Sequence, residues 1–273
     1  MFQNIGLMMN TDKTEAVRMA ETAMHFLAVR GVRSFFLETD GIGMESPDLI
    51  LTFGGDGTFL SGARIAMEKD VPLMGINLGT LGFLTEEEPE RLSECLQAIL
   101  DGKAQTENRF LLKTEIPDTG AVFYALNDVV ITRGGFARLI QVDCRVNGET
   151  FGVFTADGMI AATPTGSTGY SLSAGGPIVQ PEMDCIVLTP VCAHSLQSCP
   201  CIVSGSSEIR FRLMPERNQT AELQIDGMDR GRLKAGDSVI ITGSGKTIRL
   251  LRIHPYHFFT RLRGKLIEWG TKY

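Results

Sequence analysis

The chain has 273 residues, of which 43% are hydrophobic and 21% charged, and its formal net charge is −6. This length allows one large domain or two modest domains, each with its own core. The acidic balance argues against a general nucleic-acid-binding protein, and no apolar run is long enough to cross a bilayer. The first residues also lack the layout of a secretory signal, so we expect a cytoplasmic protein without a membrane or nucleic-acid partner.

Strands and helices are predicted to alternate through the first hundred residues. The helix expected over 11–30 has apolar positions at helical spacing, a cap at Thr11 or Asp12, and an end at Gly31. This alternation predicts an α/β domain with a doubly wound, Rossmann-like parallel sheet. The other expected elements are strands at 5–9, 34–37, 49–53 and 73–77, and helices at 59–68 and 92–100.

Three glycines surround one carboxylate after the third strand, in the run Gly54-Gly55-Asp56-Gly57-Thr58. Glycine lets a backbone come close to a ligand, and such a loop can direct N–H groups and a helix N-terminus at phosphate oxygens. Asp56 could then orient a hydroxyl beside that phosphate. The alternative is a tight strand-to-helix turn in which the carboxylate caps the helix.

From about residue 106 the pattern changes to short β-rich runs separated by turn signals. Strands at 139–146 and 149–154 are joined by Asn147-Gly148, the best two-residue hairpin signal in the chain. We therefore predict an α/β domain at 1–105 and a mainly antiparallel, all-β domain at 106–253. Residues 254–273, helical near 260–269, are expected to pack back onto the first domain. Further strands are expected at 208–213, 221–225, 238–242 and 247–253.

Residues 243–247 contain a possible phosphate-binding motif. Gly243-Ser244-Gly245-Lys246-Thr247 resembles the end of a Walker A loop. However, Ile240 stands where the first glycine is required, and a strand rather than a helix follows. We interpret this run as a hairpin turn.

Two polar segments in the second domain are candidates for ligand binding. Residues 157–177 are rich in hydroxyls and glycines, which suits sugar hydroxyls and phosphates, and Tyr170 could form a flat wall against a base or ribose. Asn127 and Asp128 break a strand that otherwise has core character, which costs stability unless they bond to something. The partner could be a ligand, or the pair could mark a turn or bulge.

The six cysteines are predicted to be mostly buried thiols rather than a disulfide framework. Cys199-Pro-Cys201, with Cys192 and His194 upstream, could be drawn as a zinc site. The paired C-x-x-C spacing is missing, so we predict no protein-bound metal.

Taken together, these segments resemble the ATP-dependent NAD kinase family. The GGDGT loop, the Asn-Asp pair and the Thr-Pro-Thr-Gly-Ser-Thr stretch with its later Gly-Gly-Pro occur in order between residues 54 and 177. The glycine loop alone is shared with lipid kinases and phosphofructokinases. The resemblance to NAD kinases therefore depends on the Thr/Ser/Gly stretch. Weaker likenesses at 77–84, 193–196, 226–227 and 262–266 extend the resemblance over nearly the whole chain.

The resemblance implies transfer of the ATP γ-phosphoryl group to the 2′-hydroxyl on the adenosine ribose of NAD, giving NADP. It implies Asp56 as the proton acceptor, Mg²⁺ or another divalent cation with ATP, and a homodimer or homotetramer. The implied phosphate loop is Gly54, Gly55, Gly57 and Thr58. The implied NAD contacts are Asp56, Gly57, Asn127, Asp128, Arg138, Asp157, Thr168, Gly169, Tyr170, Ser171, Leu172 and Ser173.

Several positions depart from the common family pattern, and two other functions remain alternatives. Gly169 replaces the usual alanine, and Ser61, Cys199 and Met228 stand where polar or basic residues are frequent. A lipid kinase of the diacylglycerol or sphingosine type would need an apolar acceptor groove, whereas residues 163–173 are polar. A non-catalytic nucleotide-binding regulator is disfavoured by the intact Asp56.

Overall fold

The computed structural model describes residues 2–38, 46–78, 82–85, 87–134, 138–194, 199–215 and 219–271. Residues 269–271 are described by their backbone alone. The chain forms two compact units, residues 1–108 with 248–273 (unit 1) and residues 109–247 (unit 2). It passes between them within two strands, β5 (Gln105–Ile116) and β16 (Ser238–Arg252). Residues 248–253, assigned to the second domain from sequence, group with unit 1 because Leu250 of β16 pairs with Leu73.

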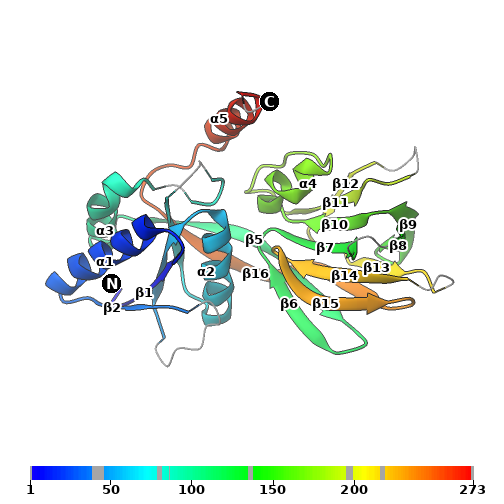
Figure 1. The fold of residues 1–273 in the computed structure, drawn as a ribbon, viewed down its shortest axis with the longest axis horizontal. Helices are drawn as coiled ribbons and strands as arrows, with labels where there is room; N and C mark the ends of the chain where they lie inside the picture. The colour runs from blue at the N-terminus through cyan, green and yellow to red at the C-terminus, as the bar shows by residue number, and fades with distance from the viewer. Residues whose placement is uncertain are drawn as a thin grey trace. The chain divides into compact units, whose positions relative to one another are not determined.

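Unit 1 is an α/β fold built on a parallel sheet (Figure 1). Its strands are ordered β2 (Arg33–Phe36), β1 (Asn4–Met9), β3 (Leu49–Gly54) and β4 (Leu73–Asn77), and neighbours run parallel. All six residues of β3 are buried, as expected for a parallel strand covered on both faces. The doubly wound α/β class predicted from the alternating pattern is thereby confirmed.

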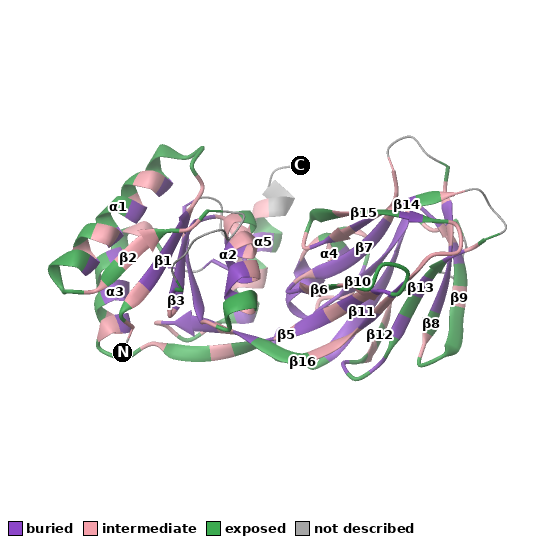
Figure 2. Ribbon diagram, turned by 90° about the horizontal axis from the view of Figure 1, so that it is seen from below, coloured by how far each residue is buried: buried purple, intermediate pink, exposed green. Residues whose placement is uncertain are grey.

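Helices cover both faces of this sheet (Figure 2). On one side α1 (Thr14–Val29) and α3 (Leu92–Leu100) share a core with β1 and β3, and on the other side lies α2 (Asp56–Lys69). A 3-10 turn, η1 (Pro89–Arg91), precedes α3, and α5 (Phe258–Thr271) closes the chain. In the described part of the chain, no helix combines the length and apolar character that crossing a bilayer requires.

The two ends of α1 test the predicted helix signals. The helix begins after Lys13, which makes no side-chain cap, so the predicted cap at Thr11 or Asp12 is wrong. The Asp12 N–H instead donates to Oδ1 of Asn10 at 3.0 Å, which keeps Asp12 in the preceding turn. Gly31 follows the helix with φ +73°, the left-handed conformation in which glycine is preferred, so the predicted end is confirmed.

Unit 2 consists of antiparallel sheets with a large hydrophobic core and a smaller second cluster that includes Val130, Ile160 and Val187. Residues such as Val142, Leu188 and Phe211 from different strands pack together in the large core, which confirms the predicted all-β class. The six-stranded sheet has the order β12 (Cys201–Ser204), β11 (Cys185–Val191), β10 (Gly158–Ala162), β7 (Asp128–Arg133), β14 (Thr220–Ile225) and β15 (Met228–Lys234). The remaining strands are β6 (Ala121–Ala125), β8 (Ile140–Val146), β9 (Glu149–Ala156) and β13 (Ile209–Leu213), with the unit 2 parts of β5 and β16.

Two turn predictions in unit 2 had opposite outcomes. Asn147 and Gly148 have φ +51° and +83° and join β8 to β9, as the hairpin signal predicts. The hairpin predicted at residues 243–247 is wrong, because β16 continues through it. A Cβ on Gly243 would lie 2.4 Å from the Gly205 carbonyl oxygen and 3.0 Å from the Phe110 ring, so a side chain would not fit there, and Gly245 has φ +67°. These glycines permit close packing and an irregularity within one long strand.

Candidate functional site

Asp56 lies at the carboxyl end of the sheet of unit 1. It is the first residue of α2 and follows β3 after a single residue, Gly55, which is the N-cap. The neighbouring strand β4 ends at Asn77, which pairs with Gly54. Ligands bind to doubly wound sheets at this edge, so Asp56 occupies the position predicted from the strand pattern.

The Asp56 carboxylate binds the turn that follows β4. Its Oδ2 accepts the Phe83 N–H at 3.1 Å, and its Oδ1 accepts those of Leu84 and Thr85 at 3.2 and 3.4 Å. Gly82 packs so closely that a Cβ there would overlap Asp56 Oδ1. The alternative interpretation required this carboxylate to cap its own helix. It binds the 82–85 turn instead, and within the described residues α2 has no side-chain cap. Since a carboxylate has about four acceptor positions, Oδ2 retains capacity for a hydroxyl donor.

The glycines of the loop differ in what the fold requires of them. A Cβ on Gly54 would lie 2.8 Å from the Thr58 Cβ, so packing within the protein excludes a side chain there. Among the described residues, a Cβ on Gly55 or Gly57 would meet nothing within 4 Å, and neither glycine has a positive φ. The fold therefore gives no reason for glycine at these two positions. Their open side exposes N–H groups at the start of a 14-residue helix, where a phosphate group could approach.

Substitution of Gly57 tests this interpretation. Gly57→Ala is expected to leave the free energy of unfolding unchanged or raise it by up to about 1 kcal/mol, because alanine is favoured in helices. Turnover is expected to fall about tenfold or more, since a methyl group would hold phosphate away from the loop amides. Urea unfolding and steady-state kinetics measure the two effects separately. Full turnover in this variant would show that no ligand needs the space beside Gly57.

In unit 2, Asn127 lies in the bend between β6 and β7, and Asp128 is the first residue of β7. The Asp226 carboxylate accepts the backbone N–H groups of Leu126, Asn127 and Asp128 at 2.8, 2.7 and 3.1 Å. Asp226 lies in the β14–β15 turn with φ +50°. The polar pair therefore does mark a turn, and that turn is fixed by a side chain about a hundred residues away. Sequence reasoning missed Asp226 as a site residue, because Asp226-Gly227 signals only a tight turn.

The Asn127 side chain has an unsatisfied acceptor. Its Oδ1 is buried and has no hydrogen-bond partner among the described residues. The Asn127 carbonyl accepts the Thr163 N–H at 2.8 Å and leaves no room for a Cβ on Gly166. A buried unsatisfied oxygen costs about 1–3 kcal/mol, a cost that a donor on a bound ligand would remove.

Asp128 and Asp226 form a pair of neighbouring carboxyl groups. Burial, and secondly the charge of Asp226, raises the pKa of Asp128 to about 7. Burial also raises the pKa of Asp226, against the opposing effect of its three backbone hydrogen bonds. With a pKa of about 7, the Asp128 carboxyl holds a proton in part of the molecules near neutral pH. The pair can therefore present a carboxyl hydrogen-bond donor as well as carboxylate acceptors.

The pH dependence of stability follows from the Asp128 carboxyl. Its pKa of about 7 in the folded protein lies above the usual 3.8, so between these values the folded chain holds a proton that the unfolded chain has lost. The free energy of unfolding is therefore expected to fall, by on the order of a few kcal/mol, as pH rises through this window. Urea unfolding at several pH values measures this slope. Asp128→Asn should reduce it, and an unchanged slope would contradict the assignment.

The hydroxyl-rich segment uses several of its hydroxyls internally. The Ser167 hydroxyl donates to the Pro164 carbonyl at 2.7 Å, and Thr168 Oγ1 donates to the Thr165 carbonyl at 3.2 Å. Ser171 Oγ lies 2.8 Å from Thr189 Oγ1, and both side chains are fully buried. These hydroxyls shape the loop around η2 (Thr165–Thr168) and α4 (Tyr170–Ser173). Among the predicted contacts at 168–173, Tyr170 and Ser173 are exposed and Gly169 and Leu172 half-buried, so these four are the accessible ones.

Tyr170 belongs to the same group of residues as the carboxyl pair. Burial raises the pKa of Tyr170, as do the nearby Cys192, Asp157 and Asp128. Tyr170 as a whole nevertheless remains 43% exposed, so its ring can form the flat wall predicted from sequence.

Asp157 is held by a residue that sequence reasoning missed. Arg133 Nε donates to Asp157 Oδ1, and the Arg133 N–H donates to the Asp157 carbonyl at 2.8 Å. No motif marked Arg133, which carries no signal beyond its position in a strand. Arg138 is exposed and, within the described residues, forms none of the hydrogen bonds or ion pairs of this group.

Comparison with known proteins identifies the family. The sequence profiles of the ATP-NAD kinase N-terminal and C-terminal domains match residues 36–104 and 126–253. An NAD kinase of Citrifermentans bemidjiense is 37% identical over 99% of this chain and 100% of its own length. The chain belongs to the NAD kinase family. An NAD kinase of Legionella pneumophila is 40% identical over 84% of this chain and 78% of its own.

Solved structures of NAD kinases have the same fold. Yeast NADH kinase complexed with NADH has a TM-score of 0.87 and 26% identity, covering 99% of this chain and 89% of its own. An NAD kinase from Archaeoglobus fulgidus in complex with ATP has a TM-score of 0.75 and 26% identity, covering 96% of each chain. The chain is thus a phosphotransferase of the NAD kinase type. Of the weaker family motifs, residues 79–81 and 195–196 lie outside the described residues.

Proposed function

We propose that this chain transfers the γ-phosphoryl group of ATP to the 2′-hydroxyl on the adenosine ribose of NAD, producing NADP. The observation that carries the proposal is Asp56, a single carboxylate fixed by three backbone N–H groups at the start of the helix that follows the glycine loop. The related yeast and archaeal kinases were solved with NADH and with ATP, which supports these two classes of substrate.

The proposed chemistry depends on positioning. Phosphoryl transfer passes through a loose transition state, so catalysis comes mainly from alignment and from neutralising charge on the phosphate oxygens. The loop residues Gly54, Gly55, Gly57 and Thr58 would bind the phosphates with their N–H groups and the positive end of α2. Asp56 would accept the proton of the 2′-hydroxyl late in the reaction, a contribution of about 10²–10⁴-fold.

Unit 2 would supply most of the NAD contacts. Asn127 Oδ1, which has no hydrogen-bond partner among the described residues, would provide an acceptor for the nucleotide, and the Asp128 carboxyl in its protonated form would provide a donor. The exposed ring of Tyr170 would stack on a base or ribose. The full proposed set is Asp56, Gly57, Asn127, Asp128, Arg138, Asp157, Thr168, Gly169, Tyr170, Ser171, Leu172 and Ser173.

A divalent cation, Mg²⁺ by preference, is proposed to accompany ATP. No group of three His, Cys, Asp or Glu side chains in the described ranges is placed to hold a metal by itself. The glycine loop offers one carboxylate, Asp56, beside the N–H groups that would bind phosphate, and Mg²⁺ is commonly held by one or two carboxylates together with substrate phosphates. These residues therefore fit Mg²⁺ brought by ATP, where it would neutralise charge on the phosphate oxygens.

A coupled assay tests the proposed function. Purified protein is incubated with NAD, ATP and Mg²⁺, and NADP is detected with an NADP-specific dehydrogenase. The expected result is NADP formation that requires all three additions. Phosphorylation of a lipid emulsion but not of NAD would support a lipid kinase instead. Binding of NAD without ATP turnover would indicate a regulatory protein.

The assembly and compartment are also proposals. The family resemblance favours a homodimer or homotetramer, which light scattering of the purified chain would measure. All six cysteines are free thiols, and Cys95, Cys144 and Cys185 are buried. Free buried thiols suit a reducing compartment, which supports the cytoplasm.

A further inference from the structure

The turn that binds Asp56 is itself held by two arginines from the C-terminal segment of unit 1. Arg261, on α5, donates from Nη1 to the carbonyls of Gly82 and Thr85, each at 3.2 Å. Arg252, the last residue of β16, donates from Nη1 to the Leu84 carbonyl at 3.5 Å. The turn is therefore bonded through its carbonyl groups to one segment and through its N–H groups to Asp56.

Two peptide groups of the turn each bridge one arginine and the Asp56 carboxylate. In the peptide between Gly82 and Phe83, the carbonyl accepts from Arg261 and the N–H donates to Asp56 Oδ2. In the peptide between Leu84 and Thr85, the carbonyl accepts from Arg252 and the N–H donates to Asp56 Oδ1. A cation at the carbonyl end of a peptide polarises its N–H, so hydrogen bonds arranged in series strengthen one another.

We propose that Arg261 is a positioning residue for phosphoryl transfer, fixing the Asp56 carboxylate through the 82–85 turn with the help of Arg252. The inference rests on the proposed function, because it assigns Asp56 the role of proton acceptor. In its hydrogen bonds to the turn, Arg261 touches neither the carboxylate nor the glycine loop. It acts on the reaction by keeping the turn, and with it Asp56, in one place.

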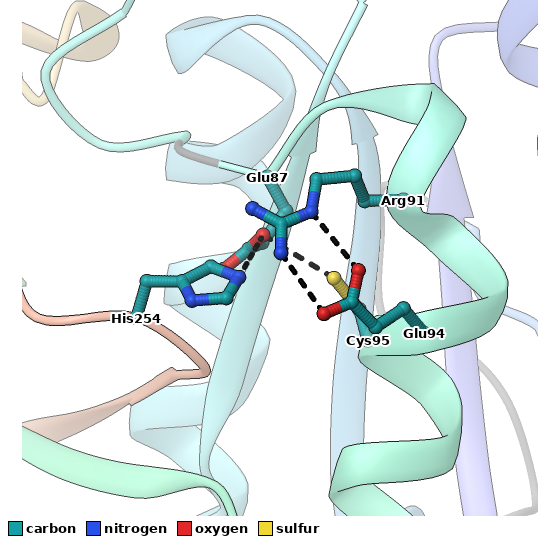
Figure 3. Close-up of polar contacts among 5 residues, drawn as sticks. All are labelled: Glu87, Arg91, Glu94, Cys95 and His254. Atoms are coloured by element: carbon teal, nitrogen blue, oxygen red, sulfur yellow. Dashed lines mark hydrogen bonds and ion pairs between the residues drawn. The ribbon is translucent and has the colours of Figure 1, made fainter.

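The chain after the turn has an anchor of its own at Glu87, and Figure 3 shows the side-chain contacts of this residue. Glu87 is 5% exposed, and its carbonyl accepts the Asn77 N–H at 2.8 Å. Its carboxylate accepts the Cys95 thiol at 3.2 Å and lies 3.9 Å from His254 Nε2. Burial, and secondly Glu87, raises the pKa of Cys95 to about 12, which keeps this thiol a donor. With Glu87 fixed, loss of Arg261 would loosen the turn without releasing η1 and α3 beyond it.

Comparison of Arg261→Ala with Arg249→Ala tests the proposal. Arg249 comes from the same C-terminal segment and also donates to a backbone carbonyl, but that carbonyl belongs to Asp70. Arg261→Ala is expected to lower kcat about 10- to 100-fold, because small displacements of a catalytic group are costly. The KM values for NAD and ATP should stay within about twofold, the pattern of a lost transition-state interaction. Arg249→Ala should leave kcat unchanged. Arg261→Lys keeps the charge without the forked donors and should recover only part of the loss.

A double-mutant cycle separates positioning from a general structural effect. If Arg261 acts through Asp56, its substitution should add little to the loss already caused by Asp56→Asn. Equal fold-losses in the two backgrounds would overturn the proposal.

Amide hydrogen exchange gives a readout that does not depend on activity. The N–H groups of Phe83, Leu84 and Thr85 should exchange faster in Arg261→Ala than in Arg249→Ala. Slow, unchanged exchange would overturn the proposal even in an active enzyme. Faster exchange in a protein that does not phosphorylate NAD would instead contradict the proposed function.

Discussion

Replacing Asp56 with asparagine is expected to slow turnover at least about 100-fold, because a positioned general base contributes roughly 10²–10⁴-fold to a rate. The NAD dissociation constant should stay near that of the unaltered protein, since most of the proposed NAD contacts lie in unit 2. Single-turnover kinetics and NAD titration measure the two quantities separately.

The hydrogen bonds of Asp56 add a structural cost to this substitution. In Asp56→Asn one carboxylate oxygen becomes an NH₂ group, which faces either the Phe83 N–H or those of Leu84 and Thr85. A donor facing a donor leaves a backbone group unsatisfied, which costs about 1–3 kcal/mol where the group is buried. We therefore expect a lower free energy of unfolding as well as slower turnover, and both must be measured.

A control at the other end of the same helix separates these effects. Asp70 is the C-cap of α2, and its side chain is 91% exposed. Asp70→Asn makes the same chemical change away from the glycine loop and should leave turnover unchanged. Near-normal turnover in Asp56→Asn would remove this residue from the mechanism, whatever its effect on stability.

The sequence predicted elements whose signals are local. The Asn147-Gly148 hairpin needs two adjacent residues with positive φ, and the helix end at Gly31 needs one, so each can be recognised without knowing the fold. The position of Asp56 at the carboxyl ends of the strands follows from strand and helix periodicity. In a parallel sheet, every loop that leads from a strand into the next helix lies at this end. The motif order along the chain then indicated the family.

Contacts between distant segments could not be predicted in this way. Asp226 fixes Asn127 and Asp128 from about a hundred residues away, and Arg261 reaches the 82–85 turn from the end of the chain. The signal at 243–247 was misleading because glycine marks both turns and close packing, and only the neighbouring strands distinguish the two.

Composition was equally ambiguous in the hydroxyl-rich segment. A buried hydroxyl must find a hydrogen-bond partner, but the sequence does not show whether that partner is protein or ligand. The Ser167 and Ser171 hydroxyls bond within unit 2, whereas the Asn127 oxygen has no partner among the described residues. A binding site is therefore better recognised by its unsatisfied groups than by its polar composition.

Removal of the Asp226 carboxylate is expected to cause the largest loss of NAD affinity. Asp226→Ala leaves the N–H groups of Leu126, Asn127 and Asp128 without their acceptor, which should lower the free energy of unfolding by about 2–4 kcal/mol. The bend that carries Asn127 and Asp128 loses its support, so the KM for NAD should rise about 100-fold, the effect of losing close to 3 kcal/mol of binding.

Asp226→Asn is the matched variant, because asparagine tolerates φ +50° and keeps one acceptor oxygen for Asn127 and Asp128. It should recover much of the stability and affinity lost in Asp226→Ala. It also removes the charge that helps to raise the pKa of Asp128, so Asp128 should titrate at lower pH than in the unaltered protein. Because Asp226 supports binding rather than proton transfer, kcat at saturating NAD should change far less than in Asp56→Asn. A KM for NAD that is unchanged in folded Asp226→Ala would show that the bend at residues 126–128 does not bind the dinucleotide.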